Sequence, residues 1–280
     1  EPRPPVAARP RRLSVTQIET WMRDPYSIFA RHVLRLRPLD PLEADPGAAE
    51  RGTFIHDALD KFINAYPDTL PPDALPQLLR FGQEAFRPAL SQPAVWAFWW
   101  PRFERIAAWV IDAERRRRPS LNASYSERSG RLVIEGPEGL FTLTAKADRI
   151  DRLAEGGYEI IDYKTGVAPK REDVGLGFAP QLPLEAALLE NGGFQEIPAD
   201  VVTALSYWVL SGGATPGKES KVAVEGAEQS RADEALDGLR QLVASFDDPA
   251  TPYTSIPRPA RAPRFNDYAH LSRRLEWGVE

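Results

Sequence analysis

The sequence predicts a mixed α/β fold, in which helices and strands belong to one chain. Apolar residues recur at helical spacing over most of the chain up to Arg118, and from Ser124 the period changes to two, as in strands. With 280 residues, 42% hydrophobic and 27% charged, the chain can bury a sizeable core. We expect residues 13–280 to form a single domain, and residues 1–12 to be a linker or boundary segment.

The first helical segment covers residues 13–37. Ser14 or Thr16 can cap it, and Glu19 follows Thr16 at the spacing of a capping box. Asp24 and the proline after it interrupt the pattern, because proline cannot continue the hydrogen bonding of a helix. A second short helix is expected after the interruption.

Residues 51–66 form the clearest amphipathic helix. Its apolar face consists of Ile55, Leu59, Phe62, Ile63 and Tyr66. His56 lies at the margin of that face, and Gly52 lies one turn before it. Either His56 is a histidine at the edge of the core, or Gly52 clears space so that His56 can reach a metal or a phosphate.

Two further helices are expected at residues 73–92 and 94–118. The tryptophans of the second helix fall on its broad apolar face and are expected in the core: Trp96, Trp99 and Trp100. Residues 115–118 are four arginines at its end, where cations suit the helix dipole. We expect a solvated helix end there, with a phosphate clamp as the alternative.

Alternation bounded by glycines predicts an antiparallel meander over residues 124–164. A loop rich in glycine and proline follows it. The remaining elements are expected to be a helix from Gln181 to Gly192, a buried strand at 200–210, its hairpin partner at 218–226, a helix at 231–246 and an irregular tail.

Composition excludes several classes of protein. The chain has no cysteine, which excludes disulfides, thiolate zinc sites and cysteine-ligated iron–sulfur clusters and fits a reducing, cytoplasmic compartment. No apolar run approaches the ~20 residues that span a bilayer, and no signal peptide is recognised, so no membrane is expected as a partner. A net charge of −5 argues against a general nucleic-acid coat but allows a local basic groove.

Two acidic residues and a lysine stand on the last hairpin of the meander. Asp162 and Lys164 are separated by one residue, so both point to the same face of a strand. If the hairpin closes through residues 155–157, Asp148 lies across from Asp162 or one place off, with Cβ atoms about 4.5–5.5 Å apart. Carboxylates that close repel each other unless a cation lies between them. The pattern therefore indicates a divalent-cation site.

Hard cations such as Mg²⁺ prefer oxygen ligands. Asp148 and Asp162 would supply carboxylates, and Tyr163 its backbone carbonyl. If its helix packs over the hairpin, His56 would add an imidazole nitrogen, which favours Mn²⁺ as well. Lys164 would orient an attacking water and offset charge on a phosphate, so the set suits phosphodiester hydrolysis.

The segments AKADRID and IIDYKTG together resemble the nuclease core of the RecB-like branch of the PD-(D/E)XK superfamily. Residues 52–56 match the G-x-x-x-H segment that supplies a metal ligand in that branch, and Gln181 matches the glutamine that opens the following helix. Glu185 stands where the branch has a tyrosine. The resemblance implies a restriction-endonuclease-like core with a central mixed β-sheet flanked by helices. It also implies catalytic roles for Asp148, Asp162, Lys164 and Gln181.

The two ends of the chain, LSVTQIETWMRDPYSIFARHVLRLRPLDPL and FNDYAHLSRRLEW, resemble those of the C-terminal nuclease domains of the AddB family. AddB is the helicase-like subunit of AddAB helicase–nucleases, which resect double-strand breaks. The resemblance implies a bacterial DNA nuclease of break repair and recombination that cleaves the 5′-ended single strand emerging from a helicase. Its partner would be an AddA-like helicase–nuclease subunit that consumes ATP. No Walker-type motif occurs in this chain, so no ATP site is expected here.

The sequence offers further candidates for contacts to the DNA backbone, each of which would also suit a solvated surface: Lys146, Arg149, Arg152, Thr165, Lys170 and Arg171. Two other functions stay open. The chain could be a catalytically silent DNA-binding or scaffold domain with the nuclease fold, or a free-standing Cas4-like exonuclease.

The chain departs from the AddB family in one respect. Many AddB nuclease domains join their ends with a four-cysteine iron–sulfur cluster, and here Asp24 stands at the first such position. We therefore expect the ends to be held by packing instead, with residues 13–37 and 251–277 in contact. The candidates are Trp21, Tyr253, Phe265, Tyr268 and Trp277.

Overall fold

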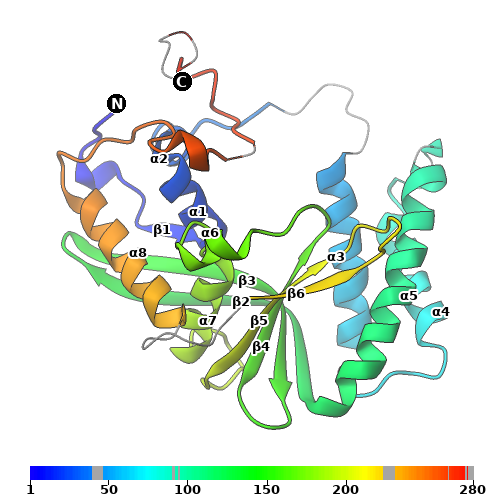
Figure 1. The fold of residues 1–280 in the computed structure, drawn as a ribbon. Coiled ribbons are helices and arrows are strands. Elements are labelled where there is room, and N and C mark those ends of the chain that lie inside the picture. The colour runs from blue at the N-terminus through cyan, green and yellow to red at the C-terminus, as the bar shows by residue number, and fades with distance from the viewer. Residues whose placement is uncertain are drawn as a thin grey trace.

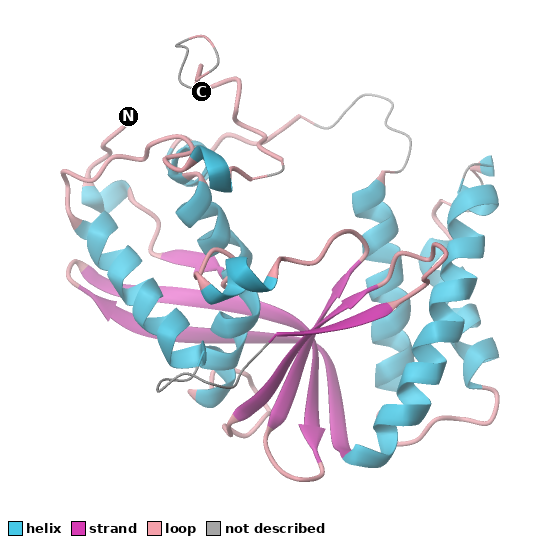
Figure 2. Ribbon diagram, viewed as in Figure 1, coloured by secondary structure: helices cyan, strands magenta, loops and turns pink. Residues whose placement is uncertain are grey.

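In the computed structural model, a mixed six-stranded β-sheet lies between two groups of helices (Figures 1 and 2). The structure describes residues 1–39, 47–89, 92–93, 95–222, 231–263, 265–274 and 276. The strands are β1 (Arg12–Ser14), β2 (Leu121–Gly136), β3 (Gly139–Leu153), β4 (Tyr158–Lys164), β5 (Val202–Val209) and β6 (Lys218–Val222). The predicted fold, a central mixed sheet flanked by helices, is confirmed.

The sheet has the order β1-β3-β4-β5-β6, with β2 paired to β3 outside this path. β2, β3 and β4 form the predicted antiparallel meander. β5 and β6 form the predicted hairpin as far as Val222; residues 223–226 lie outside the described residues. Parallel pairs join β1 to β3 and β4 to β5, and they make the sheet mixed.

β3 shares one of its edges between two neighbours. β2 runs along the whole of the other edge, so β1 and β4 both use the remaining one. β1 pairs with residues 142–144, and β4 pairs with residues 149–152. Between them, residues 145–148 have no strand partner on that edge among the described residues, and the sheet is split there.

Helices cover the two faces of the sheet in separate groups. The α-helices are α1 (Val15–Arg23), α2 (Pro25–Ile28), α3 (Ala48–Ala65), α4 (Ala74–Phe86), α5 (Trp100–Arg117), α6 (Arg171–Gly175), α7 (Gln181–Glu190) and α8 (Arg231–Asp247). Short 3₁₀ or π turns are η1 (Val6–Ala8), η2 (Phe29–Val33), η3 (Val95–Trp99), η4 (Arg118–Ser120) and η5 (Pro259–Arg261). α1, α7 and α8 pack on one face, whereas α3, α4 and α5 lie at the β4–β6 end (Figure 1).

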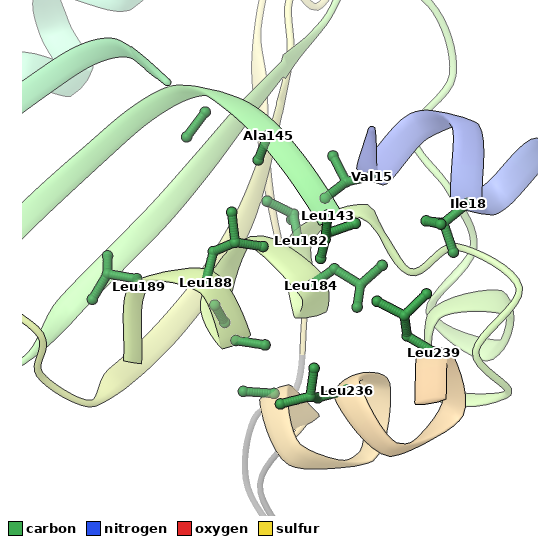
Figure 3. Close-up of a cluster of buried hydrophobic side chains, with 14 of the residues drawn as sticks. Val15, Ile18, Leu143, Ala145, Leu182, Leu184, Leu188, Leu189, Leu236 and Leu239 are labelled. Carbon is green, nitrogen blue, oxygen red and sulfur yellow. The ribbon is translucent and has the colours of Figure 1, made fainter. Parts of the chain in front are cut away.

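The first core lies between β3 and the helices α1, α7 and α8 (Figure 3). α7 is buried over nearly its whole length, and Leu182, Leu184 and Leu188 are completely inaccessible. Each such leucine contributes about 1.5–3 kcal/mol of burial free energy. This packing holds the first residue of α7, Gln181, at a defined place above the sheet.

The second core lies on the opposite face of β4, because alternate residues of a strand point to opposite faces. Ile161 and Tyr163 of β4 pack against α3, α4 and α5. α3 buries Ile55 and Leu59 on the face that the sequence predicts. His56 is thereby carried to the margin of the sheet next to β4.

The predicted packing of the two ends of the chain is observed. Asp24 is completely buried, and its carboxylate accepts hydrogen bonds from Ser27 Oγ, Asn266 Nδ2 at 2.8 Å and the backbone N–H of Ile256 at 3.0 Å. Trp21 and Tyr253 meet around a common aromatic ring, that of Phe246. The ends are therefore joined by hydrogen bonds to Asp24 as well as by aromatic packing.

Some expectations for the ends and caps are wrong. Phe265 is 80% exposed and is not part of the core, while Tyr268 is buried; Trp277 lies outside the described residues. The capping box of α1 joins Ser14 to Gln17 and not Thr16 to Glu19, because β1 already ends at Ser14.

The region predicted as one helix at 94–118 also differs. Its start is the π turn η3, and Trp96 there is 53% exposed, whereas Trp100 is buried as expected. Arg115 is exposed, but Arg117 and Arg118 are not solvated: they form ion pairs with buried carboxylates of β3, β4 and α5. The helix at 73–92 is shorter than predicted and ends at Phe86. Among the described residues, no helix combines the length and apolar character that a membrane span needs.

Candidate metal centre

The split in the sheet places Asp148 beside β4. The ladder between β3 and β4 ends at the Arg149–Ile161 pair, so the next position of its register sets Asp148 opposite Asp162. Asp148 Oδ2 accepts a 2.7 Å hydrogen bond from the backbone N–H of Tyr163. The carboxylate thus takes the place of a strand partner and is held against β4, as the sequence predicts.

His56 reaches the same point from α3. Its Nδ1 lies 3.3 Å from Asp148 Oδ1, and its Nε2 lies 3.0 Å from the carbonyl oxygen of Tyr163. Gly52 permits this approach, because a Cβ atom there would lie 3.2 Å from Thr165 Oγ1 at the end of β4. His56 therefore contacts two of the oxygen-bearing groups predicted as ligands, and it is not merely a histidine at the edge of the core.

Lys164 and Gln181 hold Asp162 on the other side of the centre. Lys164 Nζ lies 2.7 Å from Asp162 Oδ2 and donates to Gln181 Oε1 at 3.1 Å. Gln181 Nε2 in turn donates to Asp162 Oδ1 at 2.5 Å. The amide of Gln181 therefore orients both charged groups. Glu185, one turn further along α7, contacts the same amide nitrogen through Oε1 at 3.3 Å.

Burial and neighbouring charges shift the pKa values of the site. Burial raises the pKa of Asp162 to about 6, an effect that Lys164 opposes and Asp148 reinforces. Burial also raises the pKa of Glu185 well above its ordinary value, with the charges of Asp162 and Asp148 adding to it. Burial lowers the pKa of His56, but the hydrogen bond and charge of Asp148 outweigh it, so the net shift is upward. The site thus carries carboxylates that are costly to ionise.

The residues present fit a hard divalent cation. The donor set of Asp148, the Tyr163 carbonyl and His56 is assembled within contact distance, and Asp162 stands opposite Asp148. Carboxylate and carbonyl oxygens with one imidazole suit Mg²⁺ or Mn²⁺. Asp162 Oδ2 is buried and accepts no hydrogen bond from the described residues, its contact being the ion pair to Lys164. A cation would compensate this buried charge.

Glu127 is a further acidic residue of the centre that the sequence reasoning missed. One carboxylate oxygen of Glu127, one carboxylate oxygen of Asp148 and one ring nitrogen of His56 all lie within 4.8 Å of one another. Glu127 falls between the Ser126–Arg149 and Arg128–Ala147 pairs, at the level of Asp148, and its φ is +53°. Pairing β2 with β3 across the short turn after Gly136 would have placed it there.

The predicted DNA-contacting residues fall into different environments. Arg149 is wrong as a DNA contact, because it is completely buried and ion-paired with Glu114 and Asp151. Lys146 is exposed two residues before Asp148 and forms an ion pair with Glu127. The others lie further along β3, at the end of β4 or at the start of α6: Arg152, Thr165, Lys170 and Arg171.

Comparisons with known proteins give a family and distant relatives. A model of the PD-(D/E)XK nuclease superfamily matches residues 12–260. An uncharacterized protein of Rickettsia felis is 30% identical over 211 residues, which cover 73% of this chain and 24% of that protein. One of Rickettsia bellii is 29% identical over 185 residues, covering 66% and 22%. The chain thus spans about a quarter of the length of these curated relatives.

Among solved structures, the crystal structure of SSO0001 matches with a TM-score of 0.33 and 12% sequence identity. The match covers 82% of this chain and 75% of that one. A similarity of this size is too low to support conclusions about the present chain.

Proposed function

This chain belongs to the PD-(D/E)XK nuclease superfamily, and from that premise we propose that it is a Mg²⁺- or Mn²⁺-dependent deoxyribonuclease that hydrolyses phosphodiester bonds of single-stranded DNA. The observation that carries the proposal is the meeting of three separate segments at one point. α3 brings His56, β3 brings Asp148, and β4 brings Asp162 and Lys164. A lysine beside paired carboxylates and a histidine is the chemistry that metal-assisted phosphodiester hydrolysis needs.

The residues have distinct roles in this proposal. Asp148, Asp162, the Tyr163 carbonyl and His56 would hold the cation. When bound, the cation supplies Lewis acidity toward a phosphate oxygen and lowers the pKa of a water. Lys164 places its ammonium group at the carboxylate of Asp162, where it can hold a water and offset negative charge on a phosphate.

Gln181 and Glu185 support this arrangement from α7. Gln181 is anchored by the buried leucines of α7, so its amide keeps Lys164 and Asp162 in one geometry. Glu185 stands where the resembling branch has a tyrosine. Burial raises the pKa of Glu185, which favours its protonated form, and a protonated carboxyl group can donate a hydrogen bond as a phenol does.

The proposed cellular role is that of an AddB-type nuclease domain. We propose that the chain acts in a bacterial cytoplasm on the 5′-ended strand delivered by a helicase, with an AddA-like helicase–nuclease subunit as partner, in double-strand break repair and recombination. The resemblance of both chain ends to AddB nuclease domains supports this role. The greater length of the Rickettsia relatives is compatible with a domain inside a longer protein.

Cleavage of labelled single-stranded DNA with Mg²⁺ or Mn²⁺ tests the enzymatic proposal. Asp162→Asn and Lys164→Ala should each reduce the rate by roughly 10²–10³-fold or more, since each removes charge stabilisation at the reacting phosphate. Glu196→Gln is the matched control, because that side chain is 82% exposed. If the wild type were as inert as both variants, the silent scaffold function would replace the nuclease.

A further inference from the structure

A groove of about 480 Å³ runs along the sheet beside the metal centre. Its lining contains three cations and several hydroxyl groups but no carboxylate; the residues that matter here are Arg12, Ser14, Ser129, Arg131, Thr144 and Lys146. The whole chain has a net charge of −5, so this groove is a local exception to its acidic character.

The strand register leads this groove to the metal centre. Thr144 of β3 pairs with Ser14 of β1 on one side and with Arg131 of β2 on the other. Lys146 follows two residues along β3 and so lies on the same face, and Asp148 is the next residue in this series. At roughly 3.3 Å per residue, Thr144 and Asp148 are about 13 Å apart along the strand.

This face of the sheet is open to solvent. The residues between the polar ones, Leu143, Ala145 and Ala147, point to the other face and pack in the core with α1, α7 and α8. The helices α3, α4 and α5 share their core with β4 and β5, and α3 also lies against β2. Arg12 and Arg131 are exposed, and neither forms an ion pair with any described residue. Their charges are therefore available to a ligand.

The chemistry of the groove matches a sugar–phosphate backbone. Arginine, lysine and hydroxyl donors spaced along a strand neutralise and hydrogen-bond successive phosphates. Contacts to phosphates carry no sequence information, so recognition would be independent of sequence. The lining has no aromatic side chain on which a base could stack. Glu127, which pairs with Lys146, marks the end of the cationic stretch and the start of the metal centre.

We infer that this groove holds the backbone phosphates of the single nucleic-acid strand whose scissile phosphate lies at the metal centre. The inference rests on the proposed nuclease function and adds a path for the strand: along β1, β2 and β3, past Arg12, Arg131 and Lys146, to Asp148.

Binding of a fluorescein-labelled oligothymidylate, measured by anisotropy in EDTA over a range of salt concentrations, tests the inference without any cleavage. The test variant is Arg12→Gln/Arg131→Gln, and the matched control is Arg80→Gln/Arg115→Gln, two exposed arginines on α4 and α5. Loss of two phosphate contacts should lower the slope of log K against log salt by about 1.4. At ~0.1 M salt this amounts to about a 25-fold weaker affinity, with the control unchanged.

The outcomes separate this inference from the proposed function. If the wild type cleaves DNA with metal but the groove variant binds with unchanged affinity and slope, the strand path is wrong and the nuclease stands. If the variant loses binding as expected but the wild type cleaves nothing, the nuclease fails and the groove stands. If polyglutamate competes as well as unlabelled oligothymidylate, the groove is a general anion surface and its assignment to nucleic acid is overturned. An equal loss in the control variant would overturn it too.

Discussion

Neutralising Asp162 should stabilise the metal-free protein at alkaline pH, although it abolishes the proposed function. Burial raises the pKa of this carboxyl from 3.8 to about 6 in the folded protein, even though Lys164 opposes the shift. At about 1.36 kcal/mol per pH unit, this difference amounts to about 3 kcal/mol of folding free energy. The ion pair with Lys164 is already included in it.

The sign follows from proton binding. Because the folded pKa lies above the unfolded one, the folded state binds the extra proton between about pH 4 and pH 6, and stability is lost as the pH rises through that window. Asp162→Asn removes the titration. We expect the variant to exceed the wild type by up to about 3 kcal/mol at about pH 8 in EDTA, and the difference to disappear near pH 4.

Urea unfolding of both proteins at the two pH values measures this difference. The control is Asp112→Asn, an exposed carboxylate 62% accessible, which should change stability by less than about 0.5 kcal/mol. Mn²⁺ at about 100 times its Kd should stabilise the wild type by about 2.7 kcal/mol and the variant by much less. The amide introduced by Asp162→Asn also faces Lys164 Nζ, which can change stability by a constant amount at every pH. The pH dependence of the difference is therefore the diagnostic quantity. A difference between the proteins that stayed constant from about pH 4 to pH 8 would refute the electrostatic reasoning.

Three further changes probe other parts of the chain. Glu127→Gln should weaken Mn²⁺ binding in calorimetry by about tenfold. The control Glu196→Gln, at another glutamate with positive φ, should leave Mn²⁺ binding unchanged. Equal effects of the two substitutions would exclude a role of Glu127 in metal binding. Gly82→Ala should lower the free energy of unfolding by roughly 1–3 kcal/mol or more, because its Cβ would lie 2.0 Å from the ring of Phe103. Gly238→Ala has open space around its Cβ and should be neutral or stabilising in the same thermal unfolding experiment. Asp24→Ala should cost about 1–3 kcal/mol and speed proteolysis after residue 250, since it leaves the half-buried donors of Ile256 and Asn266 unpaired. Unchanged cleavage would contradict this.

Much of the site was predictable because its determinants are local. Asp148, Asp162 and Lys164 stand on consecutive strands joined by a short turn, so alternation and turn position alone give their relative placement. The approach of His56 depends on tertiary packing, yet Gly52 one turn before it is a visible signal of close contact. Their catalytic and metal-binding roles stay predictions.

Other features could not be read from periodicity. Arg149 lies on the same strand as Asp148, and an arginine there is a natural phosphate ligand by residue type. Its partner Glu114 comes from a distant helix, however, and the pair is buried together. Sequence pattern ranks arginine as a surface residue, and only the fold reveals such a pair. Glu127 was missed for a different reason: only the register of β3 with β4 was considered, whereas the register of β2 with β3 sets Glu127 at the level of Asp148.

The position of the centre follows from the way β3 divides its edge between β1 and β4. Each part of a strand edge pairs with one neighbour, so residues 145–148 of β3 lie between the part that pairs with β1 and the part that pairs with β4. Backbone polar groups next to this unpaired stretch need other hydrogen-bond partners. Asp148 supplies one by accepting the N–H of Tyr163, which turns its carboxylate toward His56. Lys146 lies in the same stretch of β3, and its side chain is exposed. The ligand set and the proposed strand path therefore both border the stretch of β3 that lies between its pairings with β1 and β4.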